Sequence, residues 1–231
     1  MLPAVRRTAT QLSLAYKRPF ASMGYTPAIS GDKLICLGKN YLEHAKELGD
    51  AVPDKPVIFL KPPSAAVVAS SQQSAVAVQL PRNRGSVHYE AEMLLRLDDN
   101  LEVDAVSLGL DLTLRELQTE LKKKGHPWEI AKAFPQSAVI GPWIDVASFP
   151  DYIETEFSFE LDGEEKQRGA ASQMMCGVPE ALKYIKGCFT LVPGDVIFTG
   201  TPKGVGPLKS GQTGTLRWGD KLSYEVSFQD S

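Results

Sequence analysis

Hydrophobic positions after residue 31 come in short runs that alternate with polar positions and are separated by glycines and prolines. Runs of this length, bounded by turn-forming residues, are typical of β-strands. Because helical periodicity covers much less of the chain, the predicted fold class is β-rich α+β. The pattern predicts strands over residues 57–60, 89–97, 156–161, 195–199 and 221–228.

The clearest helical pattern begins after Asp111 and ends at Gly125. Thr113 and Glu116 have the spacing of a capping box, which predicts a helix start at Thr113. Lysines in the last turn complement the helix dipole, and glycine is common just after a helix end. Shorter helices are predicted over residues 39–47 and from Pro179 to Gly187.

Three acidic residues are candidates for a metal site. Strand alternation places Glu90 and Glu92 on one face, with their Cα atoms about 7 Å apart, and Asp111 stands at a predicted strand end between leucines. Each has a plain alternative, because the glutamates could face water on an amphipathic strand and Asp111 could cap the next helix. Oxygen ligands without clustered Cys or His favour magnesium, manganese or calcium over zinc.

Two further positions carry groups suited to proton transfer or anion binding. His44 and Glu47 are three residues apart in a predicted helix, so the carboxylate can orient the imidazole as a base that acts near neutral pH. Lys132 lies in an apolar stretch where its ammonium needs an anionic partner, such as a substrate carboxylate or enolate. The alternatives are a solvated helix pair and a lysine that snorkels to the surface.

The segment 199–206, Thr-Gly-Thr-Pro-Lys-Gly-Val-Gly, follows a predicted strand. Its hydroxyl groups and flexible backbone suit a loop that wraps an anion. It lacks the Gly-Lys-Ser/Thr ending of a P-loop, so the prediction does not extend to nucleotide phosphates.

The composition narrows the range of partners. The 231 residues carry a formal net charge of −3, so we expect no basic surface of the kind that binds nucleic acids or anionic membranes. No apolar run reaches the roughly 18 residues that cross a bilayer. Three cysteines without a Cys-x-x-Cys pair argue against a disulfide framework or structural zinc. A small molecule is the expected partner.

Residues 1–31 differ from the rest of the chain. They contain four basic residues and no acidic one, with Ser and Thr between them, and the first acidic residue is Asp32. This composition is typical of a mitochondrial transit peptide, although a disordered basic tail has it too. We therefore expect a leader over 1–31, a catalytic domain over 32–231, and a location in the mitochondrial matrix, with the cytoplasm as the alternative.

Six segments occur together in the order seen in one enzyme family: KNYLEHAKE, FLKPPSA, HYEAE, LDLTLRELQ, KKKGHPWEIAKAF and PGDVIFTGTPKGVG. From about Lys33 to its end the sequence resembles the fumarylacetoacetate hydrolase family, and looks most like its small mitochondrial acylpyruvases and oxaloacetate decarboxylases. The resemblance implies a mixed β-roll of the C-terminal-domain type with a few short helices, usually assembled as a homodimer.

The resemblance also implies roles for individual residues of this chain. The metal, Mg²⁺ or Mn²⁺, would be held by Glu90, Glu92 and Asp111. The catalytic groups would be His44 and Glu47, on a lid that orders with ligand, and Lys132. The substrate would be bound by Gln118, Gly200 and Thr201.

The activity that the resemblance implies is the cleavage of small 2-oxo acids. Acylpyruvates would be hydrolysed at a carbon–carbon bond to pyruvate and a carboxylate, and oxaloacetate would lose CO₂ to give pyruvate. The alternatives are keto–enol tautomerisation of oxaloacetate, isomerisation of intermediates of aromatic catabolism, and a non-catalytic module that binds a metal.

Overall fold

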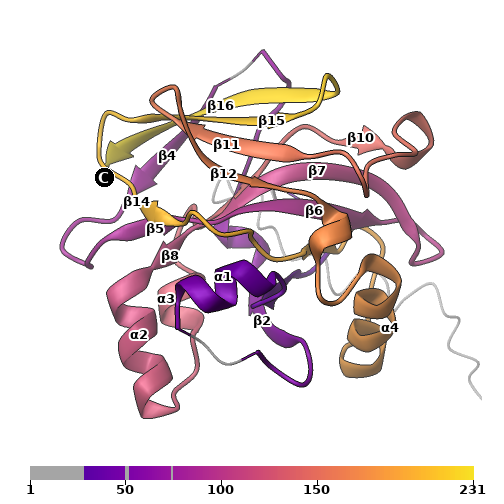
Figure 1. The fold of residues 1–231 in the computed structure, drawn as a ribbon, viewed down its shortest axis with the longest axis horizontal. Coiled ribbons are helices and arrows are strands. Elements are labelled where there is room, and N and C mark those ends of the chain that lie inside the picture. Colours follow the sequence, from indigo (N-terminus) through magenta and orange to yellow (C-terminus); the bar gives the residue numbers. More distant parts are fainter. Residues whose placement is uncertain (1–28, 50–51, 74) are drawn as a thin grey trace, which may run out of the picture.

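The structure of the chain is a computed structural model, and it describes residues 29–49, 52–73 and 75–231. Within these residues the strands form three sheets, and four short α-helices lie below them in the view of Figure 1. The predicted β-rich α+β class is confirmed. The predicted leader lies outside the described residues except for its last three positions. Among the described helices, none is long and apolar enough to span a membrane.

The largest sheet has eight strands in the described part of the chain, and it is mixed. Two neighbouring pairs, β1 with β13 and β3 with β9, are parallel, and the other pairs are antiparallel. Its strands, in spatial order, are β2 (Val57–Lys61), β1 (Leu34–Gly38), β13 (Val196–Phe198), β6 (Ala91–Leu97), β7 (Val103–Asp111), β9 (Ala138–Ile140) and β3 (Ala66–Val68), with β10 (Ile144–Asp145) beside β7.

Two smaller sheets complete the described strands. The five-stranded sheet has the order β12 (Glu164–Gly169), β11 (Phe157–Leu161), β15 (Thr213–Trp218), β16 (Leu222–Asp230) and β4 (Val76–Leu80). The three-stranded sheet consists of β14 (Gly206–Pro207), β5 (Val87–Tyr89) and β8 (Thr113–Leu114). The helices are α1 (Leu42–Glu47), α2 (Arg115–Lys124), α3 (Glu129–Lys132) and α4 (Val178–Cys188), with short 3₁₀ turns at Pro63–Ala65, Val146–Ser148 and Ala171–Gln173.

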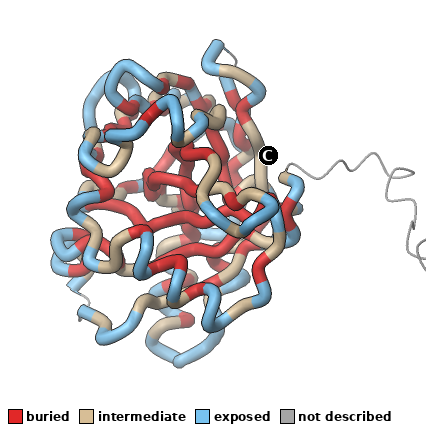
Figure 2. The backbone as a smooth tube through the Cα atoms, turned by 90° about the vertical axis from the view of Figure 1, so that its right-hand side faces the viewer, coloured by how far each residue is buried: buried red, intermediate tan, exposed pale blue. Residues whose placement is uncertain are grey.

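Most residues of the central strands are buried and the connecting segments are largely exposed, as Figure 2 shows. Strand β1 has apolar residues on both faces: Ile35 and Leu37 join one hydrophobic cluster, and Leu34 and Cys36 join another. A continuous apolar run of this kind is expected where both faces of a sheet are covered. Trp218 anchors the five-stranded side, with its ring centroid 4.9 Å from that of Phe149.

The strand predicted over residues 89–97 is interrupted at Glu90. Before this residue, β5 pairs with β8 and β14, and after it β6 pairs with β7 and β13. The chain therefore changes sheets at Glu90. At this corner the Ala91 N–H donates to the side-chain oxygen of Gln167, at 2.9 Å, in place of a neighbouring strand. The period-2 pattern continues through the corner, which is why the sequence does not reveal the break.

The predicted capping box at the start of α2 is wrong. The helix begins at Arg115, and Thr113 belongs to β8. The Thr113 hydroxyl donates to the Asp111 carbonyl at 3.2 Å, and Glu116 accepts hydrogen bonds from the backbone and hydroxyl of Ser86. Both side chains therefore have partners outside the helix end. The predicted helix end is confirmed, because Gly125 adopts a left-handed conformation with φ of 66°.

The other predicted helices form close to their expected bounds. Residues 42–47 of the segment 39–47 are helical, and α4 extends one residue beyond the predicted segment at each end. Leu182 and Ile185 of α4 are buried, as its apolar spacing requires.

Gly109 sits directly opposite Glu92 in the pairing of β6 with β7, and it leaves no room for a side chain. A Cβ atom there would lie 2.2 Å from the Val139 carbonyl oxygen and 2.7 Å from Leu94 Cδ1. We expect Gly109→Ala to lower the free energy of unfolding by about 1–3 kcal/mol in urea denaturation, because backbone and core side chains must shift.

The matched control for this substitution is Gly187→Ala in α4, where a Cβ would meet no atom within 4 Å. Alanine favours a helix over glycine by up to about 1 kcal/mol, so this variant should be as stable as the parent or more so. If both variants change stability in the same direction and by the same amount, the proposed crowding at Gly109 is wrong.

Candidate active site

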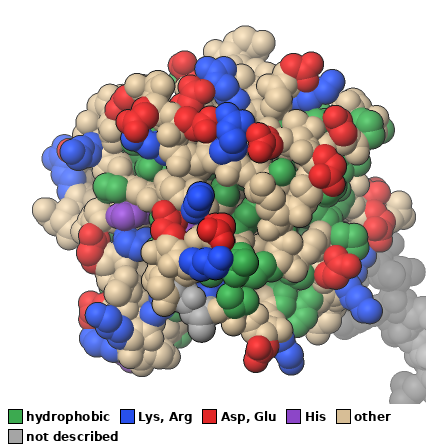
Figure 3. All heavy atoms as spheres, viewed as in Figure 1, with side chains coloured by type: hydrophobic (Ala, Val, Ile, Leu, Met, Phe, Trp, Pro, Cys, Tyr) green, Lys and Arg blue, Asp and Glu red, His purple; other side chains and the backbone are tan. Residues whose placement is uncertain are grey.

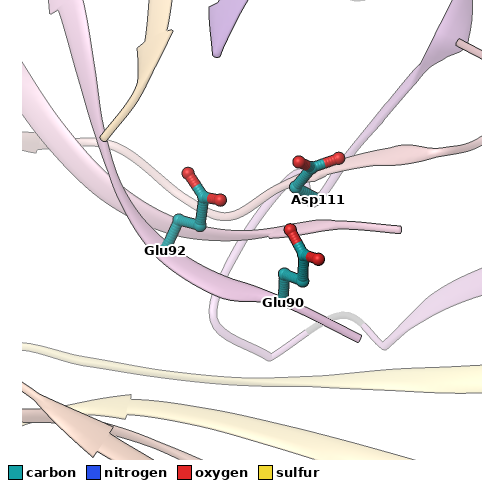
Figure 4. A group of neighbouring side chains, drawn as sticks. All are labelled: Glu90, Glu92 and Asp111. Atoms are coloured by element: carbon teal, nitrogen blue, oxygen red, sulfur yellow. The ribbon is translucent and has the colours of Figure 1, made fainter. Parts of the chain in front are cut away.

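Three carboxylates converge at the corner where the chain changes sheets. Glu90 lies between β5 and β6, Glu92 is the second residue of β6, and Asp111 ends β7. One oxygen from each lies within 4.8 Å of the others, and Figure 4 shows the three carboxyl groups pointing toward one another. The residues are 6%, 2% and 1% exposed, so the alternative in which the glutamates face water does not hold.

Lys132, the last residue of α3, points its ammonium into this cluster. Its Nζ donates to Glu90 Oε2 at 2.8 Å, to Asp111 Oδ2 at 2.6 Å and to the Thr113 hydroxyl at 2.6 Å. The anions that the apolar surroundings of Lys132 require are therefore carboxylates of the protein itself. The alternative of a surface lysine is excluded, because the residue is 2% exposed.

A second buried lysine, Lys61, escaped the sequence analysis. Its Nζ lies 2.7 Å from Asp111 Oδ1 and donates to the backbone carbonyls of Ser137, Leu112 and Lys132. Burial, the largest effect, lowers the pKa of Lys61. Lys61 ends the apolar run of β2 and is followed by two prolines. A lysine at the end of an apolar run is expected to be buried rather than at the surface, and this signal in the sequence could have identified Lys61 as a candidate.

Arg115 is the other cation that sequence reasoning missed. Its Nη2 donates to Glu90 Oε1, and its Nη1 donates to Gln118 Oε1 at 2.7 Å. Gln118, a predicted substrate contact, is therefore joined to the carboxylate cluster through Arg115. In a strand, every second side chain lies on the same face, and counting by two from Asp111 gives Thr113 and then Arg115. This extension of the strand pattern would have identified Arg115.

The cations compensate the carboxylates unequally. Burial raises the pKa of Glu90, but the charges of Lys132 and Arg115 outweigh it and hold that pKa well below its usual value. For Glu92, burial and then the negative charges of Asp111 and Glu90 raise the pKa well above its usual value. Its one hydrogen bond among the described residues comes from the Gly200 N–H, at 2.7 Å. An added cation beside Glu92 would therefore be strongly favoured, which fits a hard metal ion bound by oxygen.

His44 and Glu47 pair on α1, beside the cluster. His44 Nδ1 lies 3.0 Å from Glu47 Oε2, and His44 is buried while the Glu47 side chain is about one third exposed. The electrostatic interaction with His44 also contributes to the lowered pKa of Glu90. A small cavity is lined by His44, Glu90, Arg115, Gln118 and Lys132, among others. The imidazole is therefore not part of a solvated helix pair.

The loop 199–206 wraps anions, and within the described residues these are the protein's own glutamates. The Gly200 N–H donates to Glu92, and the Gly204 N–H donates to Glu47 Oε1 at 3.0 Å. The Thr201 hydroxyl donates to the Ala91 carbonyl and accepts from Gln167, both at 2.8 Å. Gly204 has φ of 101°, and a Cβ there would lie 2.0 Å from the Lys166 carbonyl oxygen. The loop therefore braces the carboxylate cluster and the His44–Glu47 pair together.

The face seen in Figure 3 carries positive and negative side chains interspersed. Several charged side chains of the described residues are paired, among them Arg168 with Glu156 and Glu165, and Lys46 with Glu43. Charge of one sign does not gather on this face.

The three-dimensional fold matches a solved structure over most of its length. The crystal structure of fumarylpyruvate hydrolase from Pseudomonas aeruginosa in complex with Mn²⁺ and pyruvate gives a TM-score of 0.80 at 32% sequence identity, and the match covers 86% of this chain and 90% of that one. This similarity confirms the mixed β-rich fold that the resemblance implies.

Sequence comparison gives the same result. The chain is 38% identical over 206 residues to oxaloacetate tautomerase YcgM of Escherichia coli. This alignment covers 84% of this chain and 92% of the relative. It is 36% identical over 193 residues to the mitochondrial oxaloacetate decarboxylase of Dictyostelium discoideum. This alignment covers 79% of this chain and 87% of the relative. Residues 33–229 match the family described as fumarylacetoacetate (FAA) hydrolase C-terminal. The chain belongs to the fumarylacetoacetate hydrolase family.

Proposed function

We propose that the protein is a metal-dependent enzyme that cleaves small 2-oxo acids, with Mg²⁺ or Mn²⁺ held by Glu90, Glu92 and Asp111. The observation that carries this proposal is the buried carboxylate cluster in which Glu92 has no cationic hydrogen-bond partner among the described residues. The Mn²⁺ and pyruvate in the Pseudomonas aeruginosa relative support both the metal and the substrate class.

A divalent ion in this site would polarise the 2-oxo acid and stabilise the negative charge that develops on it. The chain's own groups have distinct tasks around that charge. Lys132 supplies a fixed ammonium beside Glu90 and Asp111. Gln118 accepts from Arg115 through its Oε1, so its amide nitrogen is the group left to donate to a substrate carboxylate. With Gln118, Gly200 and Thr201 are the proposed substrate contacts.

In acylpyruvate hydrolysis, His44 takes a proton from water, and the water oxygen attacks the carbonyl at C4. The C3–C4 bond then breaks, its electron pair stays on C3 as the pyruvate enolate, and the acyl group leaves as a carboxylate. Glu47 keeps the imidazole oriented and stabilises its protonated form through the 3.0 Å contact to Nδ1. That α1 is a lid which orders with ligand is proposed from the family resemblance alone.

In oxaloacetate decarboxylation, the same enolate forms when CO₂ leaves, so no water has to be activated. This reaction depends on Lys132 and the carboxylate cluster more than on His44.

Tautomerisation of oxaloacetate is the second candidate function, and the Escherichia coli relative named for that activity favours it. There a proton moves between C3 and the 2-oxo oxygen, and no carbon–carbon bond is broken. A non-catalytic metal-binding module would show no turnover in any of these assays. A homodimer is proposed from the family resemblance alone.

Metal binding can be tested through stability. Because an ion that binds only the folded chain stabilises it by about 2.7 kcal/mol at a hundred times its dissociation constant, Mn²⁺ or Mg²⁺ should raise the melting temperature of the parent protein. In Glu92→Gln this rise should disappear, and EDTA-sensitive turnover should disappear with it. The neutral amide suits a position where burial disfavours charge, so the variant should fold.

The matched control for Glu92→Gln is Glu225→Gln, at an exposed position of β16. It should keep both the metal-induced rise in melting temperature and the activity. A full metal response in Glu92→Gln would refute the ligand assignment.

The two cleavage reactions should separate in His44→Asn. Loss of a general base typically lowers the rate by about 10²–10⁴-fold, so acetylpyruvate hydrolysis should fall by that factor while oxaloacetate decarboxylation falls much less. Pyruvate formation measures both reactions. Glu43→Gln, an exposed neighbour on α1, should leave both rates unchanged. An equal loss of both activities in His44→Asn would show that the imidazole does not act on water.

Mitochondrial import is proposed for the full chain, since residues 1–31 have transit-peptide composition and some relatives are mitochondrial. Residues 1–31 fused to a fluorescent reporter should direct it to mitochondria, and a fusion with Arg6, Arg7, Lys17 and Arg18 changed to glutamine should stay in the cytosol. A cytosolic parent fusion would favour the cytoplasmic alternative.

A further inference from the structure

His88 shares a face with the carboxylate cluster, although no role has been assigned to it. We propose that His88 is a positioning residue for Arg115: its Nδ1 accepts a hydrogen bond from one water molecule that in turn accepts from Arg115 Nε, and this bridge fixes the guanidinium beside Glu90. The kinetic consequence rests on the proposed function, whereas the hydrogen bond itself does not.

The strand register places the two side chains together. In the pairing of β5 with β8, His88 is opposite Thr113 and Val87 is opposite Leu114. The Arg115 N–H continues this ladder by donating to the Ser86 carbonyl at 3.2 Å. Paired residues on neighbouring strands share a face, and residues two apart on one strand also share a face. Because Arg115 is two residues after Thr113, the partner of His88, the side chains of His88 and Arg115 are diagonal neighbours on one face. Diagonal neighbours, with Cα atoms about 7–8 Å apart, are within reach of long side chains.

The unsatisfied atoms of these two side chains are complementary. Among the described residues, the buried side-chain atoms without a hydrogen-bond partner are His88 Nδ1, Asp111 Oδ1 and Arg115 Nε. Asp111 Oδ1 has the Lys61 ammonium at 2.7 Å. His88 Nδ1 and Arg115 Nε then remain. A neutral imidazole whose proton is on Nε2 accepts a hydrogen bond at Nδ1, whereas the Nε of arginine only donates. The two atoms are therefore one acceptor and one donor. Buried polar groups of this kind are normally paired.

Electrostatic coupling between the two groups agrees with this placement. Burial, and then the positive charge of Arg115, lowers the pKa of His88.

The third contact would determine how the guanidinium is oriented. Arg115 already donates through Nη2 to Glu90 and through Nη1 to Gln118. A planar fork held at Nε as well has no freedom to rotate about its long axis. His88 would thereby hold Gln118, the proposed substrate contact, in a fixed position relative to the carboxylate cluster without touching the substrate itself.

The kinetic test compares two substitutions at His88. His88→Leu removes the acceptor and keeps the bulk, and it should raise KM for oxaloacetate about tenfold, the size typical of coupled neighbours, with little change in kcat. His88→Asn places an amide oxygen near the position of Nδ1 and should restore KM to within about threefold of the parent. His126→Leu, at an exposed histidine, should have no effect.

A double-mutant cycle decides whether His88 acts through Arg115. Lysine keeps the charge of Arg115 but has no Nε–H, so His88→Leu should cause no further rise in KM in an Arg115→Lys background. Additive effects would mean that His88 supports the fold in general, and they would overturn the proposal.

A readout independent of activity separates this proposal from the proposed function. In ¹⁵N-resolved NMR spectra the Arg115 Nε–H should exchange slowly with solvent in the parent and in His88→Asn, and rapidly in His88→Leu. If the parent turns over neither oxaloacetate nor acetylpyruvate, the proposed function fails, and the NMR comparison still tests the hydrogen bond. An unchanged Nε–H exchange rate in His88→Leu would overturn the positioning role.

Discussion

The compensation of buried negative charge is the constraint on which this site depends. An isolated carboxylate is costly to bury, and here one oxygen from each of three carboxylates lies within 4.8 Å of the others. Lys61, Lys132 and Arg115 supply matching positive charges, each from a different element. Because α3 and the start of α2 must approach the same point as the end of β2, a strand of the large sheet, the charges constrain how these two helices pack against that sheet. The proposed catalytic groups and the fold therefore share one set of interactions.

The backbone accommodates this cluster by changing sheets. Glu90 and Asp111 lie at the corner between the three-stranded and eight-stranded sheets, and the Asp111 N–H donates to the Glu90 carbonyl at 2.8 Å. A strand that continued straight through would present its alternate side chains along a flat surface. The corner brings residues from two strands around one point, and the loop 199–206 then connects that point to α1. The position of the site is thus a property of the topology.

Local patterns predicted five strand-forming segments, α4, the end of α2 and the convergence of Glu90 with Glu92, because each depends on neighbours along the chain. The same patterns failed where long-range contacts decide. Thr113 and Glu116 have capping-box spacing, yet Lys132 and Ser86 engage them instead. The break at Glu90 leaves no trace in the alternation, since side chains keep their period through the corner. Lys61 was missed because its partners are carbonyl groups far away in sequence.

The unequal treatment of the two glutamates has a consequence for how the proposed metal site would load. The charges of Lys132 and Arg115 hold the pKa of Glu90 well below its usual value, whereas burial and the neighbouring carboxylates raise the pKa of Glu92. Protons and a divalent ion would therefore compete for Glu92 far more than for Glu90. Binding of the ion would weaken as the surroundings acidify, and Glu92 would be the residue that sets this dependence.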